Sequence, residues 1–67
     1  MDRMKCYQNV IGETFDECVN RVMQQVRAYK KKTASVVLLF DGVPLTITKA
    51  STYKSIKYDY MIKWSKL

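Results

Sequence analysis

The chain has 67 residues, of which 48% are hydrophobic and 27% are charged, and its formal net charge is +6. This length leaves room for one hydrophobic core, and the composition excludes the apolar-poor, highly charged profile of disordered chains. The longest apolar run, 36–40, is too short to cross a bilayer, which excludes a membrane span.

We expect a soluble, cytoplasmic protein with reduced thiols. The charged start of the chain is not followed by the apolar stretch of a secretion signal. Without such a signal, two cysteines indicate free intracellular thiols more often than a disulfide. Of Cys6 and Cys18, we expect the second to lie in the core.

The charge is unevenly distributed along the chain. Residues 1–20 contain two basic and four acidic residues, whereas residues 21–67 contain ten basic and two acidic residues. If the fold gathers the later bases on one face, the positive field there favours an anionic partner. Nucleic acid, a nucleotide or an acidic protein surface would fit this description. A solvated, solubilising surface is the alternative interpretation.

Residues 4–11 allow two interpretations. They could add a third strand to a sheet, but apolar and polar residues alternate only weakly there. We therefore favour a flexible, loosely attached arm for residues 1–11.

A helix is predicted from Thr14 to about Lys32. Thr14 and Glu17 are spaced as in a capping box, and acidic residues in the first turn complement the helix dipole. Apolar residues then recur three and four positions apart and form one stripe. The stripe consists of Phe15, Cys18, Val19, Val22, Val26 and Tyr29. Residues 30–32 are three lysines in the predicted last turn. Their first explanation is that cations complement the negative end of the helix dipole, and ligand binding is the second explanation.

A β-hairpin is predicted around Asp41 and Gly42. This dipeptide is typical of a type I′ turn, because both central residues need positive φ. The turn pairs Phe40 with Val43 and then Leu38 with Leu45 and Val36 with Ile47, so that six apolar side chains share one face. We expect that face to form the core.

The second face of the hairpin is polar at its open end and partly apolar near the turn. It carries Ser35, Val37, Leu39, Pro44, Thr46 and Thr48. Because proline has no backbone N–H, Pro44 predicts that its strand lies at the edge of the sheet or interrupts the ladder. A partly apolar second face also leaves room for a covering element or partner.

Periodicity alone does not decide the structure of residues 53–67. As a helix capped by Ser51 or Thr52, the segment would align Tyr53, Ile56, Tyr60, Trp64 and Leu67 on one face, with lysines around the rest. As a strand, it would alternate apolar and polar residues from 56 to 64, and its aromatic content favours that state.

The hairpin and the residues after it resemble a pattern in small accessory proteins of bacteriophages and prophages. In these proteins a Phe-Asn/Asp-Gly hairpin leads through a Ser-Thr-Tyr cap into a C-terminal helix. The matching residues are Phe40, Asp41 and Gly42, the run 43–50, and Ser51, Thr52 and Tyr53, followed by Ile56 and Tyr60. The resemblance implies a helix after Ser51 and a phage-encoded protein that binds and disables a host factor, including antiviral defence components. It implies no catalytic residue.

The sequence contains no recognisable catalytic, metal or cofactor site. The absence of histidine excludes triads and metal sites that depend on imidazole, and two cysteines cannot form a Cys₄ zinc site in one chain. Asp16 and Glu17 are adjacent, so on a helix they point in different directions. Gly12 and Gly42 are the only glycines, which is too few for a phosphate-binding loop. We therefore predict that the protein is not an enzyme, with no catalytic residues, metal or cofactor.

Two classes of binding function remain. In the first, the protein binds a host protein or an anionic nucleotide signal, and Tyr53, Tyr60 and Trp64 are candidate aromatic anchors. The alternative is that these residues belong to the core, and we favour the core for Tyr60 and Trp64. Tyr58 and Ile62 lie off the helical stripe and are then the better interface candidates. In the second, basic residues of both helices follow the phosphates of nucleic acid without reading its sequence.

We predict an α+β fold in a single domain, 1–67, in which a two-stranded hairpin packs on helices in the order α-β-β-α. We expect a homodimer, formed through the sheet edge or its second face, to extend this small fold. The predicted function is that of a non-enzymatic phage-type protein that inhibits or sequesters a host factor in the host cytoplasm. The candidate binding residues are Arg21, Arg27, Lys31, Lys32, Tyr53, Lys54, Lys57, Tyr58 and Ile62.

Overall fold

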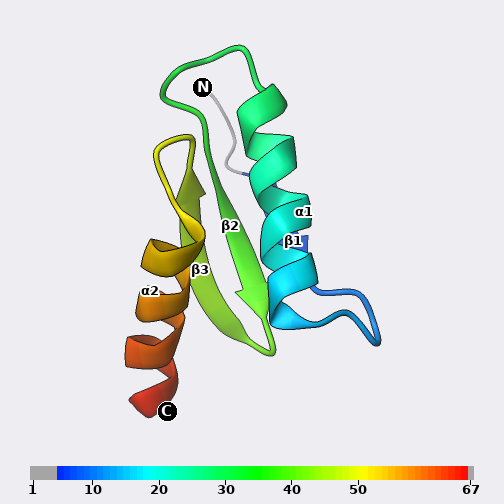
Figure 1. Cartoon of the computed structure of the whole chain (residues 1–67), viewed down its shortest axis with the longest axis vertical. Coiled ribbons are helices and arrows are strands. Elements are labelled where there is room, and N and C mark those ends of the chain that lie inside the picture. The colour runs from blue at the N-terminus through cyan, green and yellow to red at the C-terminus, as the bar shows by residue number, and fades with distance from the viewer. Residues whose placement is uncertain (1–4, 67) are drawn as a thin grey trace.

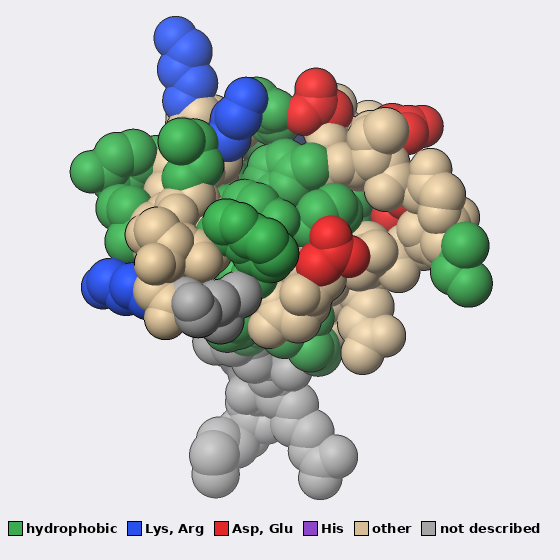
Figure 2. Space-filling view, turned by 90° about the horizontal axis from the view of Figure 1, so that it is seen from below, with side chains coloured by type: hydrophobic (Ala, Val, Ile, Leu, Met, Phe, Trp, Pro, Cys, Tyr) green, Lys and Arg blue, Asp and Glu red, His purple; other side chains and the backbone are tan. Residues whose placement is uncertain are grey.

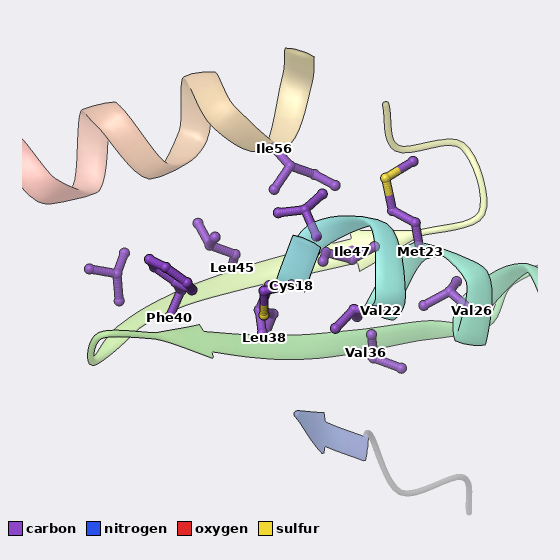
Figure 3. Packing of buried hydrophobic residues seen from close by; sticks show 12 residues of the cluster. Cys18, Val22, Met23, Val26, Val36, Leu38, Phe40, Leu45, Ile47 and Ile56 are labelled. Carbon is purple, nitrogen blue, oxygen red and sulfur yellow. The ribbon is translucent and has the colours of Figure 1, made fainter. Parts of the chain in front are cut away.

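A computed structural model of the chain describes residues 5–66, which form three strands and two helices (Figure 1). In chain order these are β1 (Lys5–Gln8), α1 (Phe15–Ala28), β2 (Ser35–Phe40), β3 (Val43–Thr48) and α2 (Tyr53–Ser65). The sheet order is β1-β2-β3, with β1 parallel and β3 antiparallel to the central strand β2. Both helices cover one face of this sheet (Figure 3). The predicted α+β class is confirmed.

The capping box at the start of α1 is present as predicted. The Thr14 Oγ1 accepts a hydrogen bond from the Glu17 N–H at 3.2 Å, and the Glu17 Oε1 accepts one from the Thr14 N–H at 3.1 Å. The end of the helix was predicted too late, because α1 stops at Ala28 and Tyr29 is extended. Residues 30–32 therefore lie in the connection to β2. The extended Tyr29 instead bonds its hydroxyl to that of Tyr7, at 2.6 Å between the oxygens.

The prediction of a loose arm is wrong for residues 5–8, which form β1. This strand pairs with β2 in parallel, and α1 is the crossover that a parallel connection requires. Its side chains contribute little to the core, since Tyr7 is half-buried and the other three are exposed. The ladder with β2 and the contact between Tyr7 and Tyr29 hold it in place, and neither feature leaves an apolar pattern in the sequence.

The predicted hairpin is confirmed in its turn and in its register. Asp41 and Gly42 have φ values of 50° and 82°, as a type I′ turn requires. Phe40 pairs with Val43, Leu38 with Leu45 and Val36 with Ile47, as predicted. β3 lies at the edge of the sheet, in agreement with the prediction from Pro44.

The core lies between the helix-covered face of the sheet and the two helices (Figure 3). Twelve hydrophobic residues of the described range 5–66 are buried there, and Cys18 is among them as predicted. They are Cys18, Val19, Val22, Met23 and Val26 of α1, Val36, Leu38 and Phe40 of β2, Val43, Leu45 and Ile47 of β3, and Ile56 of α2. The second helix thus contributes one buried side chain, whereas α1 contributes five.

Candidate functional site

Local capping and a few core contacts fix α2 on the sheet. The Thr52 Oγ1 accepts a hydrogen bond from the Ser55 N–H at 3.2 Å, and the Ser55 Oγ accepts one from the Thr52 N–H at 3.0 Å. Ile56 is only 3% exposed and projects from α2 into the core (Figure 3). The predicted C-terminal helix with its cap at Thr52 is therefore confirmed.

An aromatic cluster attaches the rest of α2 to the start of α1. The Phe15 ring centroid lies 4.7 Å from that of Tyr60 and 5.1 Å from that of Phe40. Tyr53 packs against Phe15 with 6.1 Å between the centroids, and its hydroxyl donates to the carboxylate of Asp16. Tyr53, one of the predicted binding residues, is thus partly occupied in joining the two helices.

The solvent-exposed surface of α2 is also apolar. Tyr58 is 69% exposed, Met61 60%, Ile62 37% and Trp64 54%. Residues three and four positions apart are neighbours on a helix surface, so these side chains form one continuous area. We call Tyr58, Met61, Ile62 and Trp64 the outer patch. A surface helix normally exposes its polar side and buries one apolar stripe, and α2 departs from that rule.

Trp64 does not lie in the core, contrary to the prediction. Its ring stacks on that of Tyr60, with 6.1 Å between the centroids and 9° between the planes, but the other side faces solvent. Tyr60 is half-buried against the core. The sequence singled out Tyr58 and Ile62 as interface candidates and missed Met61. The spacing of Met61 three residues after Tyr58 was the signal that could have identified it.

Lysines surround the outer patch. Lys54 and Lys57 are exposed, and the Nζ of Lys57 lies 5.8 Å from the centroid of the Tyr53 ring. Within the described residues of α2 the one acidic side chain is Asp59, and its Oδ2 lies 3.3 Å from the Nζ of Lys63. An apolar patch with a basic border is complementary to an apolar surface with an acidic border.

A second group of bases gathers where α1 ends. The Nζ of Lys5 lies 5.5 Å from the centroid of the Tyr29 ring, and the Nζ of Lys49 donates to the Tyr29 carbonyl. We call Lys5, Arg27, Lys30, Lys31, Lys32 and Lys49 the basic end. Acidic side chains lie at the opposite end of α1, as Figure 2 shows from below. The fold therefore converts the uneven charge of the sequence into a charge separation along α1.

Arg21, another predicted binding residue, has an internal role. Its Nε lies 2.9 Å from the Glu13 Oε2, and its Nη2 donates to the Gln8 carbonyl at 2.9 Å. These contacts tie the β1–α1 connection to the middle of α1. The hydrogen bond from Arg21, supported by the Val10 N–H, lowers the pKa of Glu13 from 4.5 to about 2. Of the remaining predicted residues, Arg27, Lys31 and Lys32 belong to the basic end, and Lys54, Lys57, Tyr58 and Ile62 lie on or beside the outer patch.

We expect this ion pair to give the protein a defined acid sensitivity. Because the pKa of Glu13 is lower in the folded state, its contribution to stability is complete above pH 4.5 and is lost as the pH falls towards 2. Thermal unfolding followed by circular dichroism should therefore give the Glu13→Gln variant a lower melting temperature than the wild type at every pH above 4.5. The two melting temperatures should converge as the pH approaches 2, and a constant difference over this range would contradict the assignment.

The described residues 5–66 contain no cluster of three or more His, Cys, Asp or Glu side chains that could hold a metal ion. Among those residues there is also no helix with the length and apolar character needed to cross a membrane. Comparison with protein-family models, with characterised proteins and with solved structures gave no match.

Proposed function

We propose that the protein works by stoichiometric binding and that the outer patch is its binding surface. The partner is a protein segment with an apolar side and acidic flanks, such as an acidic amphipathic helix. The observation that carries this proposal is the exposure of four large apolar side chains in one continuous area of α2, a helix that already buries Ile56 in the core. Exposed apolar patches of this kind are typical of interaction sites.

The chemistry of the outer patch fits a protein partner well. Tryptophan and tyrosine are enriched among residues that dominate binding energy, and methionine adapts its shape to different partners. Lys54 and Lys57 would contribute chiefly to the rate of association and to the choice of an acidic partner. The resemblance to phage accessory proteins supports a bacterial host factor as the partner, which the bound protein would inhibit or sequester in the host cytoplasm.

Substitution of two patch residues tests the proposal. Wild type and a Tyr58→Ser/Met61→Ser variant are immobilised and exposed to bacterial lysate, and the affinity of the captured protein is then measured by calorimetry. We expect the double variant to bind at least about 30-fold more weakly, the effect of losing about 2 kcal/mol at an interface hot spot.

The matched control is a Gln24→Ser/Gln25→Ser variant, which changes two exposed residues of α1 and should bind like the wild type. A further variant, Lys54→Glu/Lys57→Glu, should slow association with the acidic partner and reduce its dependence on salt. Equal binding by the wild type and the Tyr58→Ser/Met61→Ser variant would contradict the proposal.

The basic end supports a second candidate function, the binding of nucleic acid through its phosphates. Six basic residues from three segments meet there, and the acidic residues of α1 lie at the other end of the helix. In this case the captured material would be nucleic acid, and its affinity would fall steeply between low and moderate salt. A Lys30→Glu/Lys32→Glu variant would then lose binding, whereas the Tyr58→Ser/Met61→Ser variant would retain it.

A further inference from the structure

The sheet has one face that neither helix covers. The strand register places three rows of side chains on it: Gln8, Leu39 and Pro44 in one, Cys6, Val37 and Thr46 in the next, and Ser35 with Thr48 in the third. Both helices and the core lie on the other side of the sheet (Figure 3). We call these eight residues the open face.

The open face carries no charged side chain among its eight residues. This is unusual for this chain, in which 12 basic and 6 acidic residues are distributed over 67 positions. Lys5 of β1 is not part of this surface, since it pairs with Val36 on the helix-covered side and its Nζ lies over the Tyr29 ring. The centre of the open face is apolar, because Val37 and Leu39 lie on the middle strand and are only half-buried.

We propose that the open face binds a second copy of the chain, face to face, in a symmetric dimer. Two copies that each carry a net charge of +6 repel one another, so they associate most easily through a surface without charge. A two-fold axis through the open face brings like residues together and places Val37 and Leu39 of one copy over the same pair of the other. Sheets that pack in this way lie about 10 Å apart.

The alternative of joining two sheets along β3 is disfavoured by the local structure. Pro44 has no N–H to offer at that edge, and its carbonyl already accepts a hydrogen bond from the Nζ of Lys63 at 2.7 Å. Further along the strand, the Thr48 N–H donates to the Ser51 Oγ at 2.9 Å. Pro44 and Thr48 therefore offer fewer free backbone groups to a neighbouring strand.

The size of the open face predicts a weak dimer. Three strands about 4.8 Å apart and about 20 Å long present roughly 300 Å² per copy, whereas a standard stable interface buries about 800 Å² on each partner. The dimer should therefore form only at high protein concentration. The outer patch lies on the helix layer, so both copies would keep it accessible, and a dimer could bind two partners.

Sedimentation velocity from about 10 µM to about 1 mM, the range that reveals weak association, tests the proposal under reducing conditions. We expect the average mass to rise from 7.9 kDa towards twice that value. A Thr46→Lys variant, which places a charge on the open face, should stay monomeric over the whole range. The control, Gln25→Lys, adds the same charge to an exposed position of α1 and should dimerise like the wild type.

Cys6 supplies a local readout that identifies the surface involved. Its thiol is exposed on the open face, so alkylation should slow several-fold at the concentrations at which the wild type dimerises, and should not slow in the Thr46→Lys variant. Cys18 is buried, and burial raises the pKa of its thiol to about 11, so it should remain unmodified and should not obscure the signal. A mass of 7.9 kDa at about 1 mM, or a dimer in which Cys6 reacts as fast as in the monomer, would overturn the proposal.

Discussion

Leu38→Ala is expected to remove most of the stability of the protein. Leu38 is fully buried on the central strand, where it pairs with Tyr7 of β1 on one side and Leu45 of β3 on the other. Replacing a buried leucine with alanine costs about 2–5 kcal/mol, because the apolar contact is lost and a cavity remains. A single core in a chain of this length rarely supplies more than about 3–5 kcal/mol in total.

Urea unfolding followed by far-ultraviolet circular dichroism measures this loss. The matched control is Leu39→Ala, the same substitution at the neighbouring position, whose side chain points to the open face and is only half-buried. At protein concentrations low enough to keep the chain monomeric, the Leu39 variant should lose clearly less stability than the Leu38 variant. Equal losses would mean that the two faces of β2 contribute equally to stability, which would contradict the deeper burial of Leu38.

Ile56→Ala is expected to detach α2 from the sheet. Ile56 is the one buried side chain of this helix, and Tyr53 and Tyr60, which make its aromatic contacts, are only partly buried. The substitution should cost about 2–5 kcal/mol. Because the contacts of α2 with the rest of the protein are few, the loss should appear first as local opening of the helix. Binding through the outer patch would weaken with it, since the patch depends on an ordered α2.

Hydrogen exchange resolved by residue distinguishes local from global effects. In the Ile56→Ala variant, the amides of α2 should exchange much faster, while those of β2 retain most of their protection. Ile62→Ala is the matched control, because it changes the same residue type on the same helix at an exposed position, and it should shift stability by at most about 0.5 kcal/mol. Unchanged exchange in α2 would show that the aromatic cluster alone holds the helix.

The sequence predicted those parts of the fold that local signals determine. The cap at Thr14, the turn at Asp41 and Gly42, and the alternation on both sides of that turn depend on neighbouring residues, and all were found where expected. The C-terminal helix was ambiguous from periodicity, since its outer side is as apolar as its inner side. The capping residues after Ser51 and the resemblance to phage proteins favoured the correct structure.

Features that depend on contacts between distant segments could not be predicted in the same way. β1 is held by its ladder with β2 and by the bond between the hydroxyls of Tyr7 and Tyr29, residues 22 positions apart. The same contact helps to explain the early end of α1. The basic end forms only when β1 and the connection before α2 bring Lys5 and Lys49 to Tyr29. For the outer patch, the sequence identified Tyr58 and Ile62. The exposure of Trp64 could not be predicted, because it depends on where α2 lies on the sheet.

The parallel pairing of β1 with β2 also has a consequence for the order in which we expect the protein to assemble. The hairpin of β2 and β3 closes over a two-residue turn, whereas β1 can dock only after the whole segment 9–34 has been arranged around α1. Closing a longer loop costs more chain entropy, and contacts of large sequence separation form late. We therefore expect the first strand in the chain to be the last to join the sheet. Since three of its four side chains are exposed, we also expect it to be the first to leave when the native state fluctuates.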